Sequence, residues 1–128
     1  MISTEEKRRL NKELREECWG YSERGNKPDG AYIKEGEYFF NINKIKRLIE
    51  AGADVNAKDV NGESPLYRAV DRDSVILAKY LISAGANVNA KDIDGYSPLY
   101  YAVDGNNKAI AKLLIKAGVD VIESLFIE

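Results

Sequence analysis

Apolar residues in the middle of the chain recur at the spacing of short helices that come in pairs. Leu66, Ala69 and Val70 lie at positions i, i+3 and i+4, which places them on one face of a helix. After a polar break at 71–74, a second set of apolar residues has helical spacing: Leu77, Ala78, Leu81 and Ile82. The pattern therefore predicts two short helices, each with one apolar face to bury against a neighbour.

The whole unit returns at a fixed interval along the chain. When residues 51–83 are laid over 84–116, 20 of the 33 positions are identical, and Gly52, Gly85 and Gly118 keep the same spacing. A fixed period of this size is typical of a repeat protein, in which each unit covers the apolar face of the next. We expect three copies, at about 31–57, 58–90 and 91–122.

The polar segments between the helices carry residues that suit turns and helix ends. Asn61-Gly62 and Asp94-Gly95 tolerate the positive φ angles of a tight turn. Ser64-Pro65 and Ser97-Pro98 follow. The serine can accept a hydrogen bond from a free amide of the first turn, and proline at the first helical position lacks an amide that would be unpaired there. We therefore expect a helix to begin at each of these prolines.

The N-terminal segment departs from the repeat. In the charged stretch from Ser3 to Cys18, Leu10, Leu14 and Cys18 form a narrow apolar stripe at i, i+4 and i+8. Ser3 and Glu6 have the spacing of a capping box. We expect residues 1–30 to form a helix that caps the first repeat, followed by a loop.

The first copy is less regular than the others. Trp19 and Tyr21 are expected to anchor the capping helix, and the loop is expected to run from Ser22 to Gly30, where glycine and proline are frequent. The second helix of this copy has the full apolar pattern of Ile42, Ile45, Leu48 and Ile49. The first helix is expected to be degenerate, with Tyr32, Ile33, Tyr38, Phe39 and Phe40 in place of the Ser-Pro-Leu start.

The C-terminal residues 123–128 form a short tail rich in apolar side chains. Together with the residue before it, the tail contains Ile122, Leu125, Phe126 and Ile127. We expect the tail to fold back over the exposed end of the third copy. The alternative is a docking strip for a partner or for a second copy of the chain. Lys108 stands where the earlier copies have Val75 and Ile42, which indicates that no further repeat covers that surface.

Two segments resemble the ankyrin repeat, whose consensus starts with D-G-x-T-P-L-H and ends with G-A-D-V-N-A. This chain has D-G-Y-S-P-L-Y at 94–100 and G-A-D-V-N-A at 52–57, and the resemblance covers about 41–122. It implies an all-α fold, an ankyrin-repeat solenoid of stacked helix-turn-helix units. The histidine usual in the family, which ties neighbouring loops together, is replaced by Tyr67 and Tyr100. We expect the fold to survive, with a tyrosine hydroxyl in that role.

Composition narrows the class of function. The chain has 128 residues, enough for one domain, and a net charge of -2, which disfavours binding to nucleic acid. No stretch approaches the roughly 18 apolar residues that cross a bilayer, and the charged N-terminus does not resemble a signal peptide. We expect a cytoplasmic monomer that binds neither nucleic acid nor membrane.

Residues suited to catalysis are scarce. The chain has no histidine and a single cysteine, which excludes histidine acid–base pairs, a disulfide within the chain and the common zinc sites. Cys18 lies on an apolar stripe and is interpreted as a small buried hydrophobe rather than a nucleophile. Asp59 and Asp92 recur with the repeat and therefore belong to the turns. We predict no catalytic residue, no metal and no cofactor.

The resemblance implies a binding surface made of turn tips and the exposed side of the first helices, which together form a concave face. These positions change between copies while the framework repeats, as V-N-G-E becomes I-D-G-Y. The candidate binding residues carried over by position are Val60, Asn61, Glu63, Asp71, Arg72, Ile93, Asp94, Tyr96, Tyr101 and Asp104. Most of the charged ones are acidic, which favours another protein with a basic surface as the partner.

The function implied is that of a non-catalytic module that binds one protein target. It could act as an inhibitor or neutraliser of that target, or as an adaptor that joins partners, and the sequence does not choose between them. A rival of another class is a substrate role. Ankyrin-like proteins are targets of asparagine hydroxylation at the loop position matched here by Asn56 and Asn89.

Overall fold

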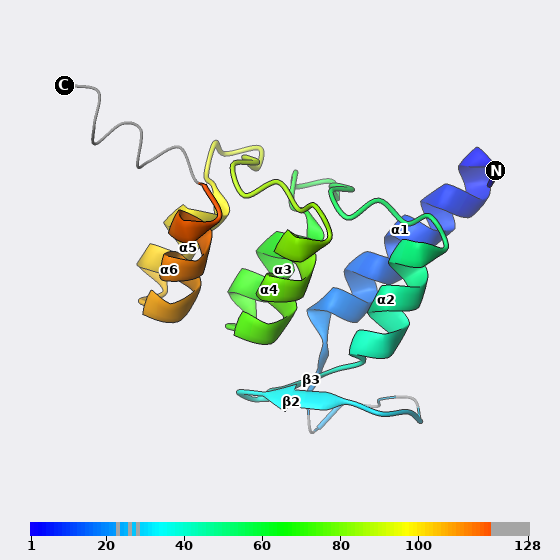
Figure 1. Ribbon diagram of the computed structural model, residues 1–128, viewed down its shortest axis with the longest axis horizontal. Coiled ribbons are helices and arrows are strands. Elements are labelled where there is room, and N and C mark those ends of the chain that lie inside the picture. The colour runs from blue at the N-terminus through cyan, green and yellow to red at the C-terminus, as the bar shows by residue number, and fades with distance from the viewer. Residues whose placement is uncertain (23, 26, 28, 119–128) are drawn as a thin grey trace.

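The computed structural model describes residues 1–118 except 23, 26 and 28. Its helices are α1 (Thr4–Trp19), α2 (Ile42–Glu50), α3 (Pro65–Asp71), α4 (Val75–Ser83), α5 (Pro98–Asp104) and α6 (Lys108–Lys116). Its strands are β1 (Tyr21–Ser22), β2 (Ile33–Glu35) and β3 (Tyr38–Phe40). Figure 1 shows three helix pairs side by side in one row, with the long loops along one end and the small sheet at the other. The expected stack of helix pairs is confirmed.

The helices begin where the sequence predicts. Both α3 and α5 start at the proline that follows a serine, and the Ser97 hydroxyl accepts a hydrogen bond from the amide of Tyr100 at 3.3 Å. Ser64 makes no such bond. The second helices are capped more regularly, because the residues before them accept from the third amide inside each helix. These caps are Asn41, Ser74 and Asn107.

The first helix pair differs from the expectation. No helix forms over 32–40. Those residues instead contribute β2 and β3, which pair antiparallel with β1 in the order β1-β3-β2. Aromatic and β-branched side chains in this segment favour strands, and Gly36, at φ 64°, permits the tight turn between them. The expected degenerate helix is therefore wrong, and Ser22, expected in the loop, pairs instead with Tyr38 in the sheet.

The missing helix is supplied by α1. This helix packs against both α2 and α3, as α3 packs against both α4 and α5. The Ser3 hydroxyl accepts from the amide of Glu6 at 3.1 Å, which confirms the expected start of the helix. The sheet is thus an insertion between the two helices of the first pair.

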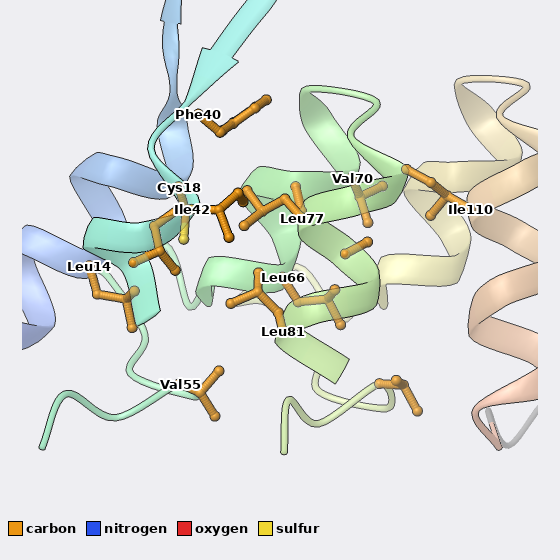
Figure 2. Close-up of a cluster of buried hydrophobic side chains, with 14 of the residues drawn as sticks. Leu14, Cys18, Phe40, Ile42, Val55, Leu66, Val70, Leu77, Leu81 and Ile110 are labelled. Carbon is orange, nitrogen blue, oxygen red and sulfur yellow. The ribbon is translucent and has the colours of Figure 1, made fainter. Parts of the chain in front are cut away.

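One apolar cluster runs through all three pairs. Its fully buried members include Leu14 and Cys18 of α1, Leu66 of α3, Leu77 of α4 and Ile110 of α6. Figure 2 shows these side chains as a continuous row between the helices. Burial raises the pKa of the Cys18 thiol to about 12, as expected of a cysteine that serves as a core hydrophobe.

Two further expectations concern the C-terminal tail and segments that could cross a membrane. The tail at 123–128, with Ile122 before it, lies outside the described residues. Among the helices described, none is long and apolar enough to cross a membrane.

Candidate protein-binding surface

The turn tips between the helix pairs are held by aspartate side chains. The Asp59 carboxylate accepts from the amides of Asn61 and Glu63 at 2.8 and 3.0 Å, and Asp92 forms the same bonds one repeat later. The amide of Ile93 also donates to the carbonyl of Asn61 at 3.1 Å, which joins neighbouring tips. Each tip therefore has a fixed shape and a fixed place beside the next.

Both tips present an apolar side chain to solvent. Val60 is 93% exposed and Ile93, its equivalent in the next repeat, is 70% exposed. A third apolar element lies beside Ile93, where Tyr96 stacks on Tyr100 with ring centres 4.1 Å apart and both rings partly exposed. Exposed apolar side chains gathered on rigid tips are typical of an interaction surface.

A groove of about 180 Å³ lies between the C-terminal end of α1 and the first helices α3 and α5. It is lined by Trp19, Glu63, Tyr67, Arg68, Asp71 and Tyr101, so it brings together three residues predicted from the sequence. A larger hollow beside the sheet, of about 460 Å³, is lined by none of the predicted residues. We therefore place the candidate surface at the groove and not at the larger hollow.

The charges around the groove are mainly negative. Arg68 is held by Asp59, with its Nη2 atom 3.1 Å from the carboxylate. Glu63 is half-buried, and its pKa is raised first by burial and then by the charge of Asp59, with smaller contributions from Asp92 and Asp71. A cation placed in the groove would relieve this repulsion.

Tyrosine hydroxyls tie the loops behind the groove. The Tyr67 hydroxyl lies 2.9 Å from the carbonyl of Ala90 and is also within reach of the carbonyl of Tyr96. Burial, followed by the charge of Asp92, raises the pKa of Tyr67 to about 12, so the hydroxyl keeps its proton for donation. Tyr101 donates to the Asp92 carboxylate, which lowers the pKa of Asp92 and raises that of Tyr101. The expected role of tyrosine in place of histidine is confirmed at Tyr67.

The structure places one predicted binding residue elsewhere. The Nε atom of Arg72 donates to the carbonyl of Trp19 at 2.8 Å, and its Nη1 atom donates to the Tyr38 hydroxyl at 2.7 Å. Its guanidinium also stacks on the rings of both residues. Arg72 thus joins α1, the sheet and α3, and little of it remains for a partner.

The other predicted residues lie on the surface. Asn61 and Asp94 are exposed at the tips, and Asp71 and Asp104 are exposed at the ends of α3 and α5. Sequence reasoning did not place Trp19 or Arg68 at this site. Trp19 comes from a helix outside the repeat pattern. Arg68 could have been found, because it stands one repeat before Tyr101, which is among the predicted residues.

The second helices carry positive charge. Lys46, Lys79 and Lys112 occupy equivalent positions of the three copies on α2, α4 and α6, and all three are exposed. The acidic candidates lie instead on the tips and the first helices. The described part of the chain contains no group of three or more cysteine, aspartate or glutamate side chains that could hold a metal ion.

Comparison with known proteins agrees with this arrangement. A family model described as ankyrin repeats, in three copies, matches residues 37–124, which is well over half of the chain. No curated protein matches the chain. From the helix pairs, the constant repeat period and this match, it follows that the chain belongs to the ankyrin repeat family.

Proposed function

We propose that this protein binds one protein partner through its tip-and-groove surface, defined as the tips at 59–63 and 92–96 together with the groove between α1, α3 and α5. Ankyrin repeats generally mediate protein–protein interactions. The observation that carries the proposal is the exposure of Val60 and Ile93 at equivalent tips. Neither side chain contributes to the apolar core, and exposed apolar side chains on ordered turns are typical of a surface that contacts a partner.

The charge of this surface favours a basic partner. Glu63 and Asp71 line the groove, and Asp94 and Asp104 lie at its margins. A lysine or arginine side chain that enters the groove would meet carboxylates and the ring of Tyr101, a combination that attracts cations.

We further propose that the protein acts as an inhibitor or neutraliser of its target. A continuous surface made of two adjoining tips and a groove is well suited to covering one site of one partner. An adaptor needs a second surface of comparable character. The lysine row on the second helices lacks apolar side chains as exposed as Val60 and Ile93.

The proposal is tested by affinity isolation from the source cells with the tagged full chain. The double variant Val60→Ser/Ile93→Ser should lose the partner that the unmodified protein retains. Ile76→Ser is the matched control, because Ile76 is a partly exposed apolar residue on α4, away from the tips. If the double variant and the control retain the partner equally well, the tips do not bind it and the proposal is wrong.

The substrate role at Asn56 and Asn89 has weaker support. The Asn56 amide group donates to the carbonyl of Gly85 and accepts from the amide of Asn87, at 3.1 and 2.7 Å. A hydroxylating enzyme would have to open this connection between loops. An intact mass larger by one oxygen atom, in protein isolated from its own host, would favour this role.

A further inference from the structure

The third helix pair exposes a face that the second pair buries. Val70 of α3 is 4% exposed, whereas Val103 of α5, its equivalent, is 64% exposed. Tyr67 and Tyr100 are likewise 4% and 43% exposed. Figure 2 shows Val70 lying between the second and third pairs, and α5 packs on α3. The corresponding face of α5 therefore points away from the stack.

The second helix of the third pair continues this face. Lys108, Ala111 and Ile115 lie at i, i+3 and i+7 on α6, which places them on one side of the helix. Ala111 is half-buried, although its equivalent Ala78 is fully buried. A hollow of about 120 Å³ between α5 and α6 is lined by residues that include Val103, Lys108 and Ala111. We call the surface formed by Tyr100, Val103, Lys108, Ala111 and Ile115 the end face.

A fourth turn of the same kind cannot follow. Asp59 and Asp92 hold the two turns that the structure describes, and the equivalent position one repeat later is Leu125. The glycine of the turn, Gly62 or Gly95, is likewise replaced by Glu128. The residues after α6 therefore lack both the aspartate and the glycine that the turn requires. A further repeat in the same register does not cover the end face.

Residues 119–128 match the end face in composition. Six of these ten residues are apolar: Val119, Val121, Ile122, Leu125, Phe126 and Ile127. The charged ones are all acidic, namely Asp120, Glu123 and Glu128, while α6 carries the exposed lysines Lys108, Lys112 and Lys116. Apolar residues with acidic neighbours complement an apolar face beside a basic helix.

The segment is also long enough and close enough. Ten extended residues reach about 33 Å, whereas the nine residues of α6 rise about 14 Å. A segment that starts at residue 119, directly after Gly118, can therefore run back along the whole of α6. Because it is tethered, its effective concentration is in the millimolar range, which a second copy of the chain would have to exceed.

We propose that residues 119–128 fold back in the same molecule over the end face and close the C-terminal end of the stack. The tail thereby does at this end what α1 does at the other. The end of the stack is then unavailable for association between molecules.

The test is paramagnetic relaxation in the full-length protein. A nitroxide label is attached to the variant Glu128→Cys. Cys18 does not compete for the reagent, because it is fully buried. Amide signals of Val103 and Ala111 should lose most of their intensity in the oxidised sample. The amide of Gly36, in the turn of the inserted sheet, should keep its intensity.

One further sample, a mixture of two preparations, decides between a tail of the same molecule and the tail of a second copy. When labelled chain without isotope is mixed with isotope-enriched chain without label, the signals should stay intact. A loss in this mixture means that the tail of a second copy covers the face, and it overturns the proposal. If the amide signals keep their intensity both in the labelled full-length protein and in the mixture, the proposal is overturned as well.

A pair of variants tests whether apolar packing is the cause. Leu125→Ser with Phe126→Ser, in the labelled chain, should abolish the loss at Val103 while leaving the amide positions of residues 1–95 unchanged. The matched control is Ile93→Ser, which changes an exposed apolar residue at a tip. In this control the nitroxide should still reduce the amide signal of Val103. If the tail variant still gives the full effect, apolar packing does not hold the tail and the proposal is wrong.

Discussion

At the scale of single residues, Tyr67 has the most consequential position. It fills the place of the histidine usual in the family, and its hydroxyl reaches the carbonyl of Ala90, at the end of the same copy, and the carbonyl of Tyr96, in the next copy. Its ring is buried, so water does not replace these bonds when the hydroxyl is removed. Tyr100 is the same residue type one repeat later, but there it is partly exposed.

We expect Tyr67→Phe to lower the free energy of unfolding by about 1–3 kcal/mol, because the buried carbonyl of Ala90 loses its donor. The control Tyr100→Phe should change it by no more than about 0.5 kcal/mol, as is usual for an exposed position. Urea denaturation of both variants measures the difference. Equal effects at the two positions would mean that the hydroxyl of Tyr67 does not hold the loops together.

At the scale of elements, the inserted sheet is the main departure from the repeat, and it is fastened to the second helix pair at two points. Arg72 bonds to Trp19 and Tyr38, as described above. The Glu35 carboxylate of β2 accepts from the amide of Ile76 at 3.1 Å, in the first turn of α4. A negative charge at a helix start is favourable, because the first amides have no partner inside the helix.

We expect Arg72→Ala to lower the free energy of unfolding by about 1–3 kcal/mol and to expose Trp19, whose ring the guanidinium covers. Arg72→Lys should not restore either property, because an ammonium group lacks the planar shape that stacks and forms two bonds. Trp19 is the single tryptophan of the chain, so its fluorescence reports the change directly. An emission maximum unchanged in Arg72→Ala would contradict this account.

The elements also show how far the sequence alone leads. The repeat period and the Ser-Pro starts predict α3 to α6, because each depends on residues close together in the chain. The place of α1 as the first helix of the first pair was not predictable in this way. It depends on contacts with α2 and α3 across an insertion of more than twenty residues. Similarly, the tips were predicted from their positions in the repeat, whereas the groove needs Trp19 beside α3.

At the scale of the whole molecule, charge is divided between two surfaces. Carboxylates gather at the tips and along the first helices, and lysines repeat on the second helices. Such a division orients an approaching charged partner before contact, and it acts mainly on the rate of association.

We expect the double variant Asp71→Lys/Asp94→Lys to slow association with the isolated partner about tenfold at low salt, since charge steering of this kind raises such rates by 10 to 1000 times. The difference should shrink as salt is added. Glu37→Lys with Glu50→Lys is the control, because these exposed carboxylates lie on the sheet turn and on α2. Stopped-flow mixing measures the rates. Equal rates for the variant and the unmodified protein would exclude a basic partner for this surface.

The backbone bond between Ile93 and Asn61 has a consequence for how such a protein can change over time. If each new tip bonds to its neighbour in the same way, duplicating one repeat adds one tip to the row and leaves the existing tips unchanged. The region that is recognised on a partner can thus lengthen by one repeat at a time, while the exposed side chain at each tip varies independently.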